Sequence, residues 1–208
     1  QKLWSFFLSY RGPDSSECLH INDKLTMAFH RLAIMGISES GNQPMKHPND
    51  DSLTLICNGE IYNYKNLAEQ YGFRLTTGSD SEIILHLFKE IGMEDTLKAL
   101  DGVFMFVLYD EINDILYAGR DPIGVRPGFI SLNGDEVFIS SEAKSLIGIS
   151  KNTMPFPPGS WWSSNDNEKF NKYFYCKPDV KNNDSHIDIL QNIKSLLTDA
   201  VIKRLMSE

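Results

Sequence analysis

The chain has 208 residues, of which 41% are hydrophobic and 23% charged, and its formal net charge at pH 7 is -8. This composition is typical of a globular protein, and the length suits one large domain or two small ones. The acidic balance argues against non-specific binding to nucleic acid, and no apolar stretch is long enough to cross a bilayer. We therefore expect neither a nucleic-acid partner nor a membrane partner.

Cysteine usage favours a reducing compartment. The three cysteines, Cys18, Cys57 and Cys176, are widely spaced and form no Cys-x-x-Cys pair, which argues against a disulfide framework and a zinc site. We therefore expect a cytoplasmic location. The five histidines also lack the spacing of metal ligands, so no metal is expected in this chain.

The first part of the chain predicts strands joined by loops. We expect the end of a helix over residues 1–10 and a strand over 25–37. A polar loop is expected over 41–51 and a buried strand over 53–57. The buried strand is expected to stop at Asn58, because an amide, a glycine and a carboxylate follow its apolar run.

Two helices are predicted in the middle of the chain. Asn63 is placed to cap a short helix over residues 64–71. Ser79 and Glu82 have capping-box spacing before an apolar stripe of helical period, and Gly92 is a fitting end for that second helix.

The second half of the chain predicts antiparallel hairpins and a final helix. Two hairpins are expected over residues 103–119 and 129–140, followed by a short helix over 141–147. The stretch 150–185 is expected to be rich in loops, with short strands near Trp161 and Tyr173, and the final helix is expected over 190–205. Asp184 or Ser185 is a candidate cap for the final helix. Because strands and helices rarely alternate, the pattern favours an α+β fold with antiparallel sheets.

The stretch Asn58-Gly59-Glu60-Ile61-Tyr62-Asn63-Tyr64 carries the strongest functional signal. A strand that ends there delivers an amide donor, a backbone N–H and a carboxylate to one point. Such a set of groups can hold a polar substrate through a reaction that forms an oxyanion. Taken alone, Asn58-Gly59 is equally consistent with an ordinary turn.

Eight ordered motifs resemble the N-terminal glutaminase domain of glutamine-hydrolysing asparagine synthetase, a class II (N-terminal nucleophile, Ntn) glutamine amidotransferase. In chain order they read RGPD, HRLAI, NGEIYNY, SDSE, LDGVFMF, GRDPIGVRP, SEAKSL and FPPGS, and the likeness as a whole runs from Arg11 to Met206. The resemblance implies a four-layer αββα sandwich of two antiparallel sheets over residues 1–180. Residues 181–208 would then be a linker and the first helix leading into a synthetase domain outside this chain.

The resemblance also implies a reaction. The domain would hydrolyse glutamine to glutamate and ammonia, and the synthetase domain would use the ammonia, with ATP and Mg, to convert aspartate to asparagine. In the family an N-terminal cysteine attacks the glutamine amide, with its own α-amino group relaying the proton. This chain begins with Gln1, so the nucleophile and the first strand are expected to be absent from it, and no cofactor is expected in it.

Site residues are implied by the same resemblance. Asn58 and Gly59 are expected to form the oxyanion hole, Arg31 to bind the α-carboxylate of glutamine, and Glu60 and Asp80 to bind its α-ammonium group. Further glutamine contacts are expected from the four residues after Arg31, which are Leu32, Ala33, Ile34 and Met35. Without the family context, Arg31 would read as a surface residue and Asp80 as an acid favoured by the helix dipole.

Other functions remain open from the sequence alone. A non-catalytic glutamine-binding or scaffold domain would also lack the nucleophile, and another class II amidotransferase would share the same motifs. The motifs GRDPIGVRP and SEAK are expected to maintain the fold or to dock a partner domain. The expected partners are glutamine and the synthetase domain, and a homodimer is compatible with the sequence.

Overall fold

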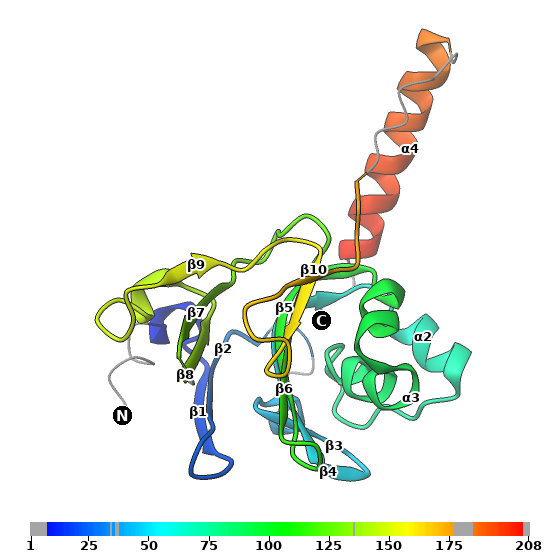
Figure 1. The fold of residues 1–208 in the computed structure, drawn as a ribbon. Helices are drawn as coiled ribbons and strands as arrows, with labels where there is room; N and C mark the ends of the chain where they lie inside the picture. The colour runs from blue at the N-terminus through cyan, green and yellow to red at the C-terminus, as the bar shows by residue number, and fades with distance from the viewer. Residues whose placement is uncertain (1–7, 34, 36–37, 135, 177–184, 206–208) are drawn as a thin grey trace.

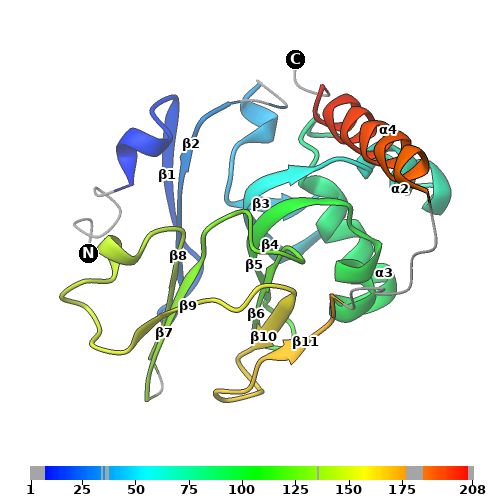
Figure 2. The same ribbon diagram turned by 90° about the horizontal axis from the view of Figure 1, so that it is seen from above.

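The computed structural model describes residues 8–33, 35, 38–134, 136–176 and 185–205. Among these residues it contains three antiparallel sheets and three α-helices. The largest sheet stands between a helical layer on one side and the two smaller sheets on the other, while α4 projects away from the body (Figures 1 and 2).

The largest sheet has six strands in the order β11-β10-β6-β5-β4-β3. In that order the bounds are β11 (Asn171–Lys172), β10 (Ser160–Ser163), β6 (Ile115–Arg120), β5 (Gly102–Asp110), β4 (Asp50–Ile61) and β3 (Met45–His47). The smaller sheets are the hairpin of β1 (Ser15–His20) and β2 (Thr26–Arg31), and the sheet β8-β7-β9 with strands Glu136–Ser140, Phe129–Asn133 and Thr153–Pro155. The helices are α2 (Tyr64–Tyr71), α3 (Glu82–Ala99) and α4 (His186–Arg204), with 3₁₀ turns at Ser9–Arg11, Glu39–Gly41 and Ala143–Ser145.

Strand β5 divides the hydrophobic core in two, because successive side chains of a strand point to opposite faces. Phe104 and Phe106 pack against the helices, whereas Met105 and Val107 pack in the space between the sheets. The run is therefore apolar on both faces. Complete burial of a large apolar side chain such as Phe104 stabilises the fold by roughly 1.5–3 kcal/mol.

These layers confirm the expected mixture of helices and antiparallel sheets. Helices α2 and α3 cover one outer face of the six-stranded sheet, and the second strand layer is divided between β1-β2 and β8-β7-β9 (Figure 2). Within the described ranges no α-helix covers the outer face of that second strand layer. The described residues thus supply three of the four expected layers.

Two predicted boundaries around β4 are wrong. The expected loop over 41–51 contains β3 and the start of β4, and β4 does not stop at Asn58 but continues to Ile61. The reason is pairing with β5, which runs without interruption from Leu53 opposite Asp110 to Ile61 opposite Gly102. Long-range pairing here overrides the local turn preference of Asn-Gly.

The predicted helices have the expected positions but different caps. The Asn63 side chain does not cap α2; it accepts the Asp101 N–H and donates to the Ala99 carbonyl, both at 2.9 Å. The capping box of Ser79 and Glu82 does not form either, since α3 begins after Ser81 and the Glu82 carboxylate binds residues that precede the helix.

Gly92 has a φ of 76° and interrupts α3, as expected, but a second helical segment continues to Ala99. The predicted hairpins form as β5-β6 and β7-β8, and the predicted short strands form as β10 and β11. The expected helix over 141–147 is only a 3₁₀ turn, and the expected strand over 25–37 ends at Arg31. Of the expected N-terminal helix, residues 1–7 lie outside the described residues.

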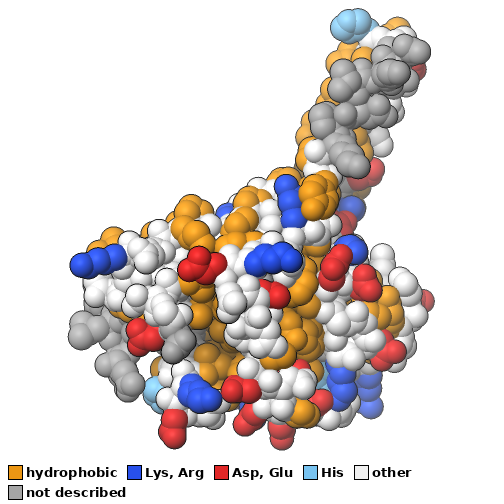
Figure 3. All heavy atoms as spheres, viewed as in Figure 1, with side chains coloured by type: hydrophobic (Ala, Val, Ile, Leu, Met, Phe, Trp, Pro, Cys, Tyr) orange, Lys and Arg blue, Asp and Glu red, His pale blue; other side chains and the backbone are white. Residues whose placement is uncertain are grey.

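Helix α4 begins with a capping box in which Ser185 and Asp188 bind each other's backbone N–H. It has no buried residue, and its hydrophobic side chains are visible along the projecting helix (Figure 3). Its C-terminal turn touches the body through Lys203 Nζ, 2.5 Å from Asp101 Oδ2, and through Arg204 over the Tyr62 ring. No described helix is both long and apolar enough to cross a membrane.

Candidate functional site

A cavity of about 290 Å³ lies between the six-stranded sheet and the smaller sheets. Seven of the nine predicted site residues line it: Arg31, Leu32, Met35, Asn58, Gly59, Glu60 and Asp80. Ala33 is not among the lining residues, and Ile34 lies outside the described residues. The structure therefore brings together segments that are far apart in the sequence, at β2, β4 and the start of α3.

The alternation of β4 turns the predicted polar groups toward this cavity. Leu55 and Cys57 face the helices, so the even-numbered positions of the strand, which include Asn58 and Glu60, point into the space between the sheets. The extended strand, rather than the expected turn, thus delivers the amide and the carboxylate to one side.

Gly59 offers its backbone N–H to the site, because its pairing with β5 turns that N–H away from β5 toward the open edge of β4. Gly59 is opposite Phe104, whose N–H and C=O are bound to Asp121 on the far side of β5. In an antiparallel pair the two residues exchange both backbone hydrogen bonds or none. A side chain at position 59 would collide with β5, since a Cβ there would lie 2.2 Å from the Val103 carbonyl oxygen.

Gln43 stabilises the same edge, and the sequence did not predict its role. Its side-chain amide accepts the Cys57 N–H at 2.5 Å and donates to the Cys57 carbonyl at 3.3 Å. The buried amide thereby replaces a neighbouring strand just before Asn58. Two positions beyond Gly59, the Ile61 N–H donates to Asp80 Oδ2 at 2.6 Å.

Three buried polar atoms of the cavity lining have no hydrogen-bond partner within the described part of the chain: Asn58 Nδ2, Arg126 Nε and His30 Nε2. Buried polar atoms are nearly always paired in folded proteins. In the cavity these atoms are available to a polar ligand or to water. Asn58 Nδ2 is an N–H donor of the kind that an oxyanion requires.

Glu60 is already half of an ion pair, because its Oε1 lies 2.8 Å from Arg126 Nη2. In the sequence, Arg126 belongs only to a motif expected to maintain the fold or to dock a partner domain. The structure shows what holds the motif in its bend: the fully buried Asp121 carboxylate accepts the N–H groups of Phe104, Val125 and Arg126. This bend places the Arg126 guanidinium at the cavity.

Asp80 lies in the wall of the cavity with only 4% of its surface exposed. Burial raises the pKa of this carboxyl to about 6, and the hydrogen bond from the Ile61 N–H opposes the rise. Nearby Glu60 adds to the rise through like-charge repulsion. A cationic group between the two carboxylates would offset the cost of burying the Asp80 charge and the repulsion between Asp80 and Glu60.

Arg31 is buried and lines the cavity, and its guanidinium binds the loop that follows β2. Nη1 donates to the Ser38 carbonyl at 3.0 Å and to Asn42 Oδ1 at 2.6 Å, and Nη2 donates to the Met35 carbonyl at 3.1 Å. The predicted clamp is therefore also an organiser of its own loop.

The RGPD turn borders the site and holds the end of β2. The Asp14 N–H donates to the Arg31 carbonyl at 3.0 Å, and Asp14 Oδ2 accepts the Ala33 N–H at 2.8 Å. Gly12 permits this approach, because a Cβ there would lie 2.1 Å from the His30 carbonyl oxygen.

The cysteines described in the structure do not offer a nucleophile to the cavity. Cys18 and Cys176 are exposed, and Cys57, although it lines the cavity, is buried on the helix side of β4. Burial raises the pKa of the Cys57 thiol to about 12, so it stays protonated at neutral pH. Across the described residues no cluster of three or more histidine, cysteine or acidic side chains could hold a metal ion.

Comparisons with known proteins find relatives that share the sequence of this chain. The family model of the glutamine amidotransferase domain matches residues 4–203. An asparagine synthetase (glutamine-hydrolyzing) from Gallus gallus is 41% identical over 160 residues, which are 76% of this chain and 28% of that relative. A probable asparagine synthetase (glutamine-hydrolyzing) from Acanthamoeba polyphaga mimivirus is 36% identical over 226 residues, covering 97% of this chain and 41% of the relative.

The fold agrees as well. The glutamine phosphoribosylpyrophosphate amidotransferase of B. subtilis superposes with a TM-score of 0.68 at 21% identity, over 82% of this chain and 45% of that chain. At this identity the likeness shows the Ntn-type fold alone. Of the two asparagine synthetase relatives, the matched part of the chain covers 28% and 41% of the length, which is less than half in each case. On the match of its sequence over residues 4–203, the chain belongs to the glutamine amidotransferase domain family.

Proposed function

We propose that this chain is the glutamine-hydrolysing part of an asparagine synthetase and that the cavity between its sheets binds glutamine. One observation carries the proposal: Asn58 Nδ2, a buried amide donor without a hydrogen-bond partner among the described residues, shares a cavity with two carboxylates and three guanidinium groups. That set of groups matches a free amino acid with a side-chain carboxamide.

The charged ends of glutamine have complementary groups in the cavity. Glu60 and Asp80 would bind the α-ammonium group, and Arg31 with its loop would bind the α-carboxylate. Arg126 pairs with Glu60, and the cavity lining holds the guanidinium groups of Arg11, Arg31 and Arg126 beside the two carboxylates. An analogue without the amine would leave Asp80 buried without a cation, which is a basis for selectivity.

The carboxamide end of glutamine would meet Asn58 and Gly59. Both donors would stabilise the oxyanion that forms when a thiolate attacks the amide carbon. In this proposal the thiolate is the N-terminal cysteine of the family, which this chain does not carry at position 1. Cys57 does not replace it, because its thiol stays protonated at neutral pH.

The ammonia would serve a synthetase domain that follows residues 1–180, with 181–208 as the linker and first helix. ATP and Mg would act in that domain, because the Ser-Gly-Gly-Leu-Asp-Ser type of pyrophosphate-binding motif does not occur in these 208 residues. The free cysteines of the described residues fit a reducing compartment such as the cytoplasm.

Calorimetric titration of this chain with L-glutamine tests the proposal. We expect saturable binding that Asp80→Asn and Glu60→Gln each weaken by about tenfold or more, since each removes a charge-assisted contact. Glu94→Gln, on the exposed side of α3, is the matched control and is expected to bind normally. An intact domain that shows no saturable binding of glutamine would refute the proposal.

Hydrolysis is tested in a version of the protein that carries the family's N-terminal cysteine. Asn58→Ala is expected to lower kcat by about 10²–10³ with little change in glutamine affinity, as for loss of one oxyanion donor. Equal loss of affinity and kcat would contradict an oxyanion role for Asn58. Stimulation of glutamate release by ATP and aspartate in the full-length protein would distinguish an asparagine synthetase from other class II amidotransferases.

A further inference from the structure

A second buried carboxylate lies just outside the cavity, in the segment that carries Asp80. Glu82 is the first residue of α3 and has no exposed surface, yet it is not part of the cavity lining. A buried charge is costly unless several hydrogen bonds compensate it. The reaction proposed above does not use this group, so its burial calls for another explanation.

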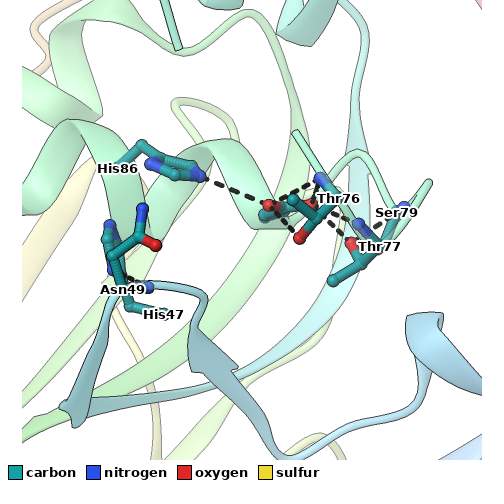
Figure 4. Close-up of polar contacts among 7 residues, drawn as sticks. His47, Asn49, Thr76, Thr77, Ser79 and His86 are labelled. Carbon is teal, nitrogen blue, oxygen red and sulfur yellow. Dashed lines mark hydrogen bonds and ion pairs between the residues drawn. The ribbon is translucent and has the colours of Figure 1, made fainter. Parts of the chain in front are cut away.

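The Glu82 carboxylate binds polar groups of the preceding loop, whose residues Thr76, Thr77 and Ser79 are labelled together with His86 in Figure 4. It accepts the Thr76 N–H at 2.9 Å through both oxygens, the Thr77 N–H at 2.7 Å, and the two threonine hydroxyls at 3.1 and 2.7 Å. His86 Nε2 lies 3.3 Å from Glu82 Oε1, one helical turn further on. Burial acts to raise the pKa of Glu82, but the bonds from His86, Thr77 and Thr76 outweigh it and lower the pKa to about 2.

This network continues toward Asp80. Thr77 Oγ1 accepts the Ser79 N–H at 3.2 Å, and Ser79 Oγ accepts the Ser81 N–H at 3.4 Å. Asp80 is thus flanked on both sides by bonded residues, while its own carboxylate accepts the Ile61 N–H of β4. The loop is fixed at two points, one at Glu82 and one at the strand that carries Glu60.

We propose that Glu82 is a positioning residue for the ammonium end of the glutamine site. By binding Thr76 and Thr77 it fixes the loop 76–81 and so sets the Asp80 carboxylate against β4. Glu82 itself touches no substrate. The inference rests on the proposed glutamine site and adds a residue that determines its selectivity for the α-amino group.

Titration of the chain with L-glutamine and with glutaramate, which lacks only the α-amino group, tests this role. Glu82→Gln keeps the size of the side chain but removes the charge and introduces an amide donor among the Thr76 and Thr77 donors. We expect glutamine to bind about tenfold more weakly, as for loss of a charge-assisted contact, and glutaramate to bind almost unchanged. In the double variant with Asp80→Asn, glutamine should bind no more weakly than to Asp80→Asn alone, because both changes remove the same contact.

Two further variants keep the test decisive. Thr96→Val removes a buried hydroxyl that donates to the Gly92 carbonyl at 2.7 Å in the same helix, and should leave both affinities unchanged. If Glu82→Gln does not fold, Thr77→Val serves in its place: it keeps the N–H bond, loses the hydroxyl bond, and should weaken glutamine alone by a few-fold.

The outcomes separate the two levels of the proposal. Unchanged glutamine affinity in the folded variant, or an equal loss for glutamine and glutaramate, would overturn the positioning role while leaving the glutamine site intact. Additive losses in the double variant would overturn it as well. Absence of glutamine binding by the unmodified chain would instead overturn the site on which the inference depends.

Discussion

Gln43 supplies the hydrogen bonds that a strand would otherwise make to β4 at Cys57. The β3–β4 ladder includes Met45 opposite Leu55, and Pro44 has no N–H to continue it. The Gln43 amide offers one donor and one acceptor, and both are used on the Cys57 backbone. One side chain thus holds the backbone immediately before the Asn58 donor.

Gln43→Leu is expected to lower the free energy of unfolding by about 1–3 kcal/mol, because it leaves a buried N–H and C=O of Cys57 unpaired. Urea denaturation with an unchanged m-value would measure the loss. Lys46→Ala, at an exposed position of the adjacent strand β3, is the control. Stability equal to that of the control would mean that water or a neighbouring group satisfies the Cys57 backbone.

Gln43, which binds the Cys57 backbone, and Arg126, which pairs with Glu60, could not be predicted from the sequence. Asn58, Glu60 and Asp80 stand in motifs whose resemblance to the amidotransferase family implied a role in the site, and all three line the cavity. Arg126 instead meets Glu60 across 66 positions of the chain, and that meeting depends on the bend that Asp121 holds. Contacts of this kind arise from packing and leave no local signature.

At the scale of elements, the loop before α3 carries two buried acids whose pKa values move in opposite directions. Burial raises the pKa of Asp80 to about 6, whereas hydrogen bonds overcome the effect of burial and lower the pKa of Glu82 to about 2. Asp80 therefore favours the folded state most below its ordinary pKa of 3.8, and that contribution is lost as pH rises through about 6. Glu82 contributes stability above 4.5 that is lost as pH falls toward 2.

Asp80→Asn is consequently expected to stabilise the domain at neutral pH while it weakens glutamine binding. The gain in free energy of unfolding should be on the order of 1–3 kcal/mol at pH 7, grow between pH 4 and 6, and level off above. Urea denaturation between pH 4 and pH 8 would measure it. A gain that does not vary with pH would show that Asp80 is not the titrating group.

The elements differed in how far the sequence predicted them. Hairpins such as β5-β6 were predictable because apolar runs and polar turns alternate locally. The end of β4 was not, since its pairing with β5 overrides the turn preference of Asn58-Gly59. The caps of α2 and α3 also differed, because Asn63 and Glu82 bind distant or preceding backbone rather than the helix N–H groups.

At the scale of the whole molecule, α4 differs from the other helices. Its apolar side chains recur at helical spacing, but most are exposed, including Leu190, Leu196 and Leu197. In α3, by contrast, the apolar side chains are packed against the sheet. A helix of 19 residues without a packed face is marginal in water, and the capping box at its start stabilises it only modestly.

We therefore expect the backbone amides of α4 to exchange with solvent far faster than those of α3, and removal of residues 177–208 to change little else. The contacts of Lys203 and Arg204 with the body are exposed and together contribute on the order of 1 kcal/mol. Hydrogen exchange detected by mass spectrometry would compare the two helices in one experiment, and denaturation of the shortened chain would measure the stability change. Protection of α4 equal to that of α3 in the isolated chain would contradict this expectation, because it would require that the helix pack its apolar face against the body. Protection that instead increases in a full-length protein would show that α4 packs against a domain outside these 208 residues and gains its stability from that contact.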